Sequence, residues 1–154
     1  MKETSQIGPA LPRRVFLAAG LSAVFAGSAV ALGLLGGLSR VHSETFQFSR
    51  GTSLAAGEEA RLRALLVSAL NDDRIHVTII AHTGSTGDVA ANQDLSDMRA
   101  EMGQSIARDM GLATNRITAR GVGGGSPAAK QTGESDRAHQ SRLARMEVAL
   151  QMRR

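Results

Sequence analysis

The chain has 154 residues, which is room for one domain of ordinary size and a short extra segment, so a second large domain is excluded. It contains no cysteine, which excludes a disulfide scaffold and a thiolate zinc site. The formal net charge of +4 is mixed along the chain without a basic patch, so we expect no nucleic acid partner.

A long uncharged segment stands near the start of the chain. Residues 1–14 are polar and end in two arginines, and residues 15–38 contain no charged side chain. That length matches what a helix needs to cross a hydrocarbon core of about 30 Å. The sequence therefore predicts a transmembrane anchor or an export signal at 15–38, with 1–14 as a basic cytoplasmic region.

Two interpretations of this segment remain open. Residues 13–17, Arg-Arg-Val-Phe-Leu, resemble a twin-arginine export signal, and residues 29–31, Ala-Val-Ala, offer a signal-peptidase site. The length exceeds the usual signal core of about 7 to 15 residues and favours a retained anchor. We therefore expect a single-pass inner-membrane protein with a periplasmic domain at 46–154, joined by a tether at 39–45. The alternative is a cleaved periplasmic protein.

Hydrophobic periodicity predicts alternating strands and helices in the domain at 46–154. The second helix carries an apolar stripe, which we expect to be core, and Gly111 is expected to end it. The stripe is Leu95, Met98, Met102, Ile106 and Met110. The other expected elements are strands at 46–48, 75–80, 116–121 and 146–150 and helices at 56–70 and 134–143.

The stretch from Ala81 to Ala100 is the candidate ligand site. A loop of Gly, Ser, Thr and Asp residues leaves the strand at 75–80 and enters a helix that carries Arg99. A guanidinium fork binds a carboxylate through two parallel hydrogen bonds. The alternative interpretation is that Arg99 forms a solvated pair with Asp97 or Glu101 on the helix surface.

Catalytic and metal-binding patterns are not indicated. The four histidines are scattered, with no pair at helical spacing. Residues 84–87 lack the spacing of a nucleophile elbow, and the glycine-rich run after Arg120 leads to Pro127 instead of the Lys of a Walker loop. We therefore expect no enzyme, no metal and no cofactor.

A spaced set of residues follows the strand at 75–80. The set comprises Ala81-His82-Thr83-Gly84, Asn92, Leu95-Ser96-Asp97-Met98-Arg99-Ala100, Arg116-Ile117, Gly121-Val122-Gly123 and Pro127. It resembles the OmpA-like domain of outer membrane protein A and MotB-type proteins, which shows G-H-T-D, an Asn, L-S-x-x-R-A, R-I, G-x-G and a Pro. The resemblance covers roughly 46–150. It implies an α/β fold of βαβαββ type, with a mixed, roughly four-stranded sheet and two main helices on one face.

The resemblance also implies a ligand. Such domains bind peptidoglycan non-covalently through the diaminopimelate of the stem peptide, with the Asp of H-T-D on its ammonium and the Arg of L-S-x-x-R-A on its carboxylate. The arginine is present here, whereas the aspartate is replaced by glycine. The expected site residues are Thr83, Gly84, Asn92, Arg99 and Arg145.

A second departure lies at the end of the family pattern, where N-R-R precedes V-E-I. The corresponding residues here are Leu143, Ala144 and Arg145, so one arginine of two remains. A further hypothesis is that Arg142 folds back and supplies the second arginine beside Arg145.

Loss of the acid at Gly84 is expected to weaken binding, because a charge partner is worth a few kcal/mol. Two interpretations follow. In the first, Asp88, Asp94 or Asp97 takes over the ammonium and the domain still attaches the protein to the wall. In the second, the fold serves as a protein-binding or structural module of the envelope without wall binding.

Overall fold

The computed structural model describes residues 38–153. The predicted N-terminal region at 1–14 and all but the last residue of the predicted anchor or signal at 15–38 lie outside the described residues. Within the described part of the chain, no helix has the length and apolar character required to cross a membrane.

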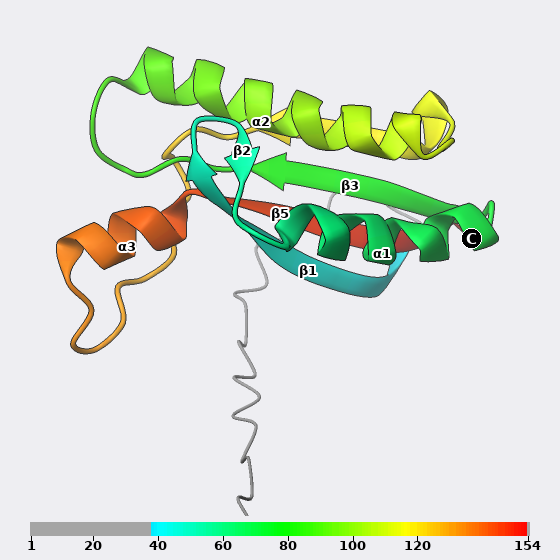
Figure 1. The fold of residues 1–154 in the computed structure, drawn as a ribbon, viewed down its shortest axis with the longest axis horizontal. Helices are drawn as coiled ribbons and strands as arrows, with labels where there is room; N and C mark the ends of the chain where they lie inside the picture. The colour runs from blue at the N-terminus through cyan, green and yellow to red at the C-terminus, as the bar shows by residue number, and fades with distance from the viewer. Residues whose placement is uncertain (1–37, 154) are drawn as a thin grey trace, which may run out of the picture.

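The described residues form a mixed five-stranded sheet with helices (Figure 1). The elements are β1 (Leu38–Arg50), β2 (Ser53–Leu54), α1 (Glu58–Asn71), β3 (Ile75–Ala81), α2 (Val89–Asp109), η1 (Thr114–Arg116), β4 (Ile117–Gly121), α3 (Asp136–Leu143) and β5 (Arg145–Arg153). The strand order is β2-β1-β5-β3-β4, and β3 and β4 form the parallel pair. The prediction of about four strands missed β2, which is too short to show a hydrophobic period.

Strand β1 is much longer than predicted. It begins at Leu38, and residues 38–47 pair antiparallel with β5, which itself continues to Arg153. The predicted tether at 39–45 is therefore wrong: these residues belong to the sheet. The cause is that Ser43, Glu44 and Thr45 are polar and are exposed or half-buried, so this part of the strand carries no apolar alternation for the sequence to reveal.

Helices α1 and α2 pack against one face of the sheet. Alternate side chains of β1, β3 and β5 meet the apolar sides of both helices there, as the period of two along a strand requires. The core residues are Phe46, Phe48, Leu62, Leu65, Leu66, Ala69, Ile75, Val77, Ile79, Ile106, Ala107, Leu112, Ile117, Met146, Val148 and Leu150.

The first half of α2 faces the sheet through small side chains instead of the predicted apolar stripe. Met98 is 51% exposed, whereas Ser96 and Ala100 are buried. A Cβ at Gly121 of β4 would overlap the main-chain nitrogen of Asp97, so α2 and β4 touch through their backbones. The stripe prediction is therefore wrong at Met98, because close backbone contact turns the small residues inward.

Candidate ligand-binding loop

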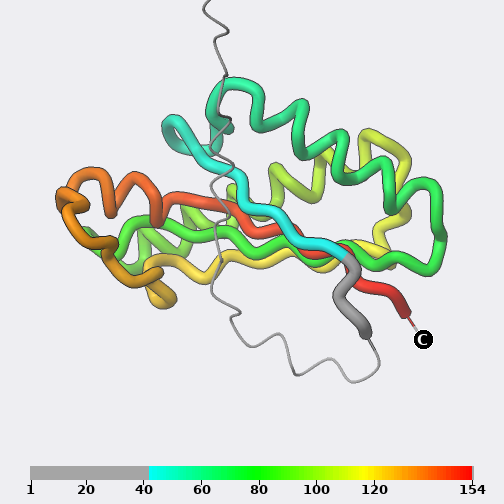
Figure 2. The backbone as a smooth tube through the Cα atoms, turned by 90° about the horizontal axis from the view of Figure 1, so that it is seen from below, coloured from blue at the N-terminus to red at the C-terminus, as the bar shows by residue number. Residues whose placement is uncertain are grey.

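The candidate loop spans residues 82–88, between the end of β3 and the start of α2. The main-chain nitrogen of His82 donates to the carbonyl of Arg145 at 2.8 Å, and that of Thr83 donates to Gly123 at 3.0 Å. At the other end of the loop, the Asp88 carboxylate accepts from the nitrogen of Ala91 at 2.7 Å and so caps α2. The loop and α3 lie at the same end of the molecule (Figures 1 and 2).

Arg99 is buried beneath this loop, with 4% of its surface exposed. Its Nη1 donates to the carbonyl of His82 at 2.7 Å and its Nε to the carbonyl of Gly51 at 2.8 Å. The guanidinium carbon lies 4.2 Å from the centre of the Phe48 ring, a cation–π contact. Arg99 therefore ties the β1–β2 turn to the end of β3.

The charge of Arg99 has no anionic partner among the described residues. Its Nη2 makes no hydrogen bond to them, and no carboxylate there lies within ion-pair distance. Burial lowers the pKa of Arg99, yet an arginine stays protonated at neutral pH because its ordinary pKa is so high. The interpretation of Arg99 as a solvated pair with Asp97 or Glu101 is therefore wrong.

Gly84 does not leave an empty space where the family has its acid. A Cβ at this position would lie 2.6 Å from the Oε1 atom of Gln140 on α3. That oxygen accepts from the main-chain nitrogen of Ser85 at 2.9 Å, and Nε2 of Gln140 donates to the Ser85 hydroxyl at 3.0 Å. A neutral carboxamide thus joins α3 to the loop, and no feature of the sequence had indicated Gln140.

Two predicted site residues brace the loop from within. The Asn92 amide donates to the carbonyl of Thr86 at 2.9 Å, from the first turns of α2. Thr83 is 3% exposed, and its hydroxyl donates to the carbonyl of Gly84 at 3.1 Å. Both side chains therefore shape the loop backbone.

Arg145 is close to the loop but its charge is neutralised. Its Nε and Nη2 each lie 2.9 Å from the Glu147 carboxylate, and Nη1 donates to the carbonyl of Leu143 at 3.3 Å. Arg142 does not supplement it. Arg142 donates to both oxygens of Glu134 at 2.8 Å and to the carbonyl of Ala129, within its own segment.

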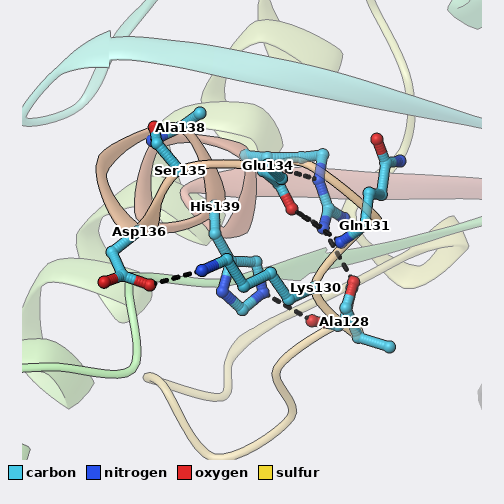
Figure 3. Close-up of polar contacts among 10 residues, drawn as sticks. Ala128, Lys130, Gln131, Glu134, Ser135, Asp136, Ala138 and His139 are labelled. Atoms are coloured by element: carbon cyan, nitrogen blue, oxygen red, sulfur yellow. Dashed lines mark hydrogen bonds and ion pairs between the residues drawn. The ribbon is translucent and has the colours of Figure 1, made fainter.

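The segment 128–144 is held together by further local contacts (Figure 3). Lys130 pairs with Asp136 at 2.6 Å, and the His139 ring contacts the carbonyl of Ala128 at 2.8 Å. The Ser135 hydroxyl accepts from the nitrogen of Ala138 and caps α3. These contacts position α3, and with it Gln140, against the loop.

The acids considered as replacements for the family aspartate have other roles or stay at the surface. Asp88 caps α2, as described above. Asp97 accepts from the nitrogen of Gly121 at 3.0 Å and from the Gln93 amide at 3.0 Å. Asp94 is exposed.

His82 is a buried residue that the sequence did not single out for the site. It is 3% exposed, and neither ring nitrogen forms a hydrogen bond with the described residues. Burial first, and then the charge of Arg145, lower its pKa to about 4, although Glu147 lies 3.5 Å away and opposes the shift. The ring is therefore neutral at pH 7.

No cluster of candidate metal ligands occurs among the described residues.

Comparison with known proteins supports the fold. The chain resembles the peptidoglycan-associated lipoprotein of Burkholderia pseudomallei with 21% identity and a TM-score of 0.59, over 73% of this chain and 90% of the other. It resembles the OmpA-like domain of FopA1 from Francisella tularensis with 17% identity and a TM-score of 0.58, over 72% of each chain. It resembles the periplasmic domain of Helicobacter pylori MotB with 15% identity and a TM-score of 0.55, over 69% and 70%.

Two sequence comparisons add to these structures. Outer-membrane lipoprotein YfiB of Pseudomonas aeruginosa is 34% identical over 82 residues, which are 53% of this chain and 46% of that protein. The chain thus matches less than half the length of this relative. The model of the OmpA family matches residues 46–141, which include β3, the candidate loop, α2 and β4. This match spans more than half of the chain, and the chain therefore belongs to the OmpA family.

Proposed function

We propose that this protein binds peptidoglycan non-covalently and so attaches to the wall of the bacterial cell envelope. The observation that carries the proposal is the buried Arg99, whose charge has no anionic partner among the described residues. A buried unpaired charge is costly, and a ligand carboxylate reduces that cost by pairing with it. The carboxylate of diaminopimelate in a stem peptide supplies such a group.

The relatives support the same location and ligand class. One structural neighbour is a peptidoglycan-associated lipoprotein, and the sequence relative from Pseudomonas aeruginosa is an outer-membrane lipoprotein. We extend from them only the envelope location and the wall as ligand. We propose no catalytic role.

A second candidate is a structural or protein-binding module of the envelope without wall binding. The arrangement at Gly84 favours it, because no acid is present and Gln140 fills the space beside the loop. Two of the three guanidinium nitrogens of Arg99 already donate to main-chain carbonyls, which gives this arginine a structural role as well.

Retention on purified peptidoglycan distinguishes the two candidates. Wall binding predicts that the folded full chain is retained, that a soluble diaminopimelate stem peptide displaces it, and that Arg99→Lys weakens retention at least about tenfold because lysine lacks the planar fork. Arg99→Ala should abolish it. The matched control is Arg108→Lys, an exposed arginine of the same helix, which should keep wild-type retention.

Each variant is first checked for folding by its melting temperature. Retention that is unchanged in Arg99→Lys and is not displaced by the stem peptide contradicts wall binding through this loop. No retention of a folded wild-type chain supports the second candidate.

The N-terminal segment decides how the domain is held in the envelope. We propose that the segment predicted at 15–38, apart from Leu38 at the start of β1, anchors the chain in the inner membrane, with removal as an export signal as the alternative. Mass spectrometry of the mature protein separates these outcomes. An intact N-terminus supports the anchor, and a start near Leu32 supports cleavage after residues 29–31.

A further inference from the structure

The carboxamide of Gln140 occupies the space in which an acidic side chain at residue 84 would lie. Its Oε1 atom is 2.6 Å from the position of a Cβ at Gly84, so the carboxamide and a side chain at residue 84 compete for one volume. The orientation of the carboxamide follows from its partners, because the main-chain N–H of Ser85 can face only the oxygen. The group next to Gly84 is therefore a neutral acceptor.

This acceptor has limited capacity. Oε1 already accepts the Ser85 nitrogen at 2.9 Å, and the Thr86 hydroxyl lies at 3.5 Å, which is too long for a strong hydrogen bond. One acceptor position is left for a ligand. An ammonium presents three donors and a full charge, whereas an amide N–H presents one donor and no charge.

The charges around the loop disfavour an ammonium as well. Arg99 has no carboxylate partner, Arg145 is neutralised by Glu147, and the buried His82 is neutral. The one carboxylate of the loop, Asp88, is engaged in capping α2. The unpaired charge beneath the loop is therefore positive. Moving an ammonium beside it costs desolvation and adds repulsion from the guanidinium, with no free acid of the loop to offset either cost.

We propose that Gln140 determines the specificity of this site, which takes a stem-peptide carboxylate whose neighbouring nitrogen is acylated in preference to one with a free ammonium. The carboxylate pairs with Arg99, and the amide N–H donates to Oε1 of Gln140. Such a nitrogen occurs where two stem peptides are joined through it. This inference rests on the wall-binding function proposed above.

The test compares two soluble muropeptides that differ by one acetyl group. The first carries a free diaminopimelate amine, and the second is the same molecule after N-acetylation of that amine. Titration of the folded full chain should give at least about tenfold tighter binding of the acetylated form, since the free ammonium loses its hydration and is repelled by the Arg99 guanidinium, whereas the amide carries no charge.

The isosteric variant Gln140→Glu places a carboxylate at the same point and should reverse the preference toward the free amine. Gln131→Glu makes the same change of charge at an exposed glutamine of the neighbouring loop and should keep the wild-type preference. A second route to the acid is the double variant Gly84→Asp with Gln140→Ala, in which the obstruction is removed. It should also prefer the free amine.

The outcomes separate this inference from the function on which it rests. Equal affinities, or a wild-type preference for the free amine, overturn the role of Gln140 and leave wall binding in place. A folded chain that binds neither muropeptide overturns both. A reversed preference in Gln140→Glu, with no reversal in Gln131→Glu, supports the inference.

Discussion

Arg142 and Arg99 lie at the same end of the molecule but differ in the partners of their guanidinium groups. Arg142 of α3 donates to both oxygens of Glu134 at 2.8 Å, and this pairing lowers the pKa of Glu134 to about 2. Arg99 of α2 is more deeply buried, yet it donates only to main-chain carbonyls. The first charge is balanced within its own segment, and the second has no carboxylate partner among the described residues.

The two arginines also differ in how far along the sequence their hydrogen-bond partners lie. Arg142 contacts Glu134 and Ala129, which are 8 and 13 residues away in the chain. Arg99 contacts Gly51 and His82, which are 48 and 17 residues away, and it joins the β1–β2 turn to the residue that follows β3, although β1 and β3 are not neighbours in the sheet. Arg142 therefore organises a local segment, whereas Arg99 stabilises the tertiary fold beneath the candidate loop.

The largest effect is expected from Arg99→Ala. The change removes two charge-assisted hydrogen bonds and the contact with Phe48, so it should lower the free energy of unfolding by about 4 kcal/mol. Urea denaturation measures the loss. Arg108→Ala, at an exposed position of the same helix, should change stability by less than about 0.5 kcal/mol. Similar losses in the two variants would contradict the tertiary role of Arg99.

The next largest effect is a pH dependence of stability that arises from His82, whose carbonyl accepts a hydrogen bond from Arg99. Burial lowers the pKa of His82 to about 4 in the folded state, against an ordinary histidine value of 6.5. Between these values the unfolded chain binds more protons than the folded one. Stability is therefore complete above about pH 6.5 and falls as pH approaches 4, by up to about 3 kcal/mol.

Urea denaturation at several pH values across this window measures the slope. His82→Gln should flatten it, because this variant removes the buried imidazole. The charged groups that face the His82 ring are Arg145, Glu147 and Arg120. The pair formed by Glu134 and Arg142 should persist across the same window, because the pKa of Glu134 is about 2. A slope that survives in His82→Gln would contradict this assignment.

Much of the fold could be predicted where apolar residues repeat along the chain. The helix expected at 56–70 is α1, and the strand expected at 75–80 is β3. The start of β1 could not be predicted, because Ser43 to Thr45 are polar and partly exposed and their place in the sheet depends on hydrogen bonds with the distant β5. The signal for that pairing is not local.

The candidate site also contains one residue that the sequence could identify and one that it could not. Arg99 could be selected from the spacing of its motif, and the structure places it beneath the loop. Gln140 could not be selected, because its contact with Ser85 joins residues 55 apart and nothing near it in sequence refers to Gly84. The only indication in the sequence was the glycine at residue 84 in place of the expected acid, which leaves room for a side chain from another part of the chain.

The smallest effect is expected from Arg142→Ala, and it completes the comparison with Arg99. An ion pair of this kind near the surface contributes at most about 1 kcal/mol, so global stability should fall by no more than that. The local consequence should be larger, because the variant frees Glu134 and the carbonyl of Ala129 and loosens the segment that positions Gln140. Hydrogen exchange of residues 128–144 should therefore increase while that of α2 stays unchanged. Equal increases in both would mean that the two regions are one cooperative unit, and that Arg142 supports the fold as broadly as Arg99 does.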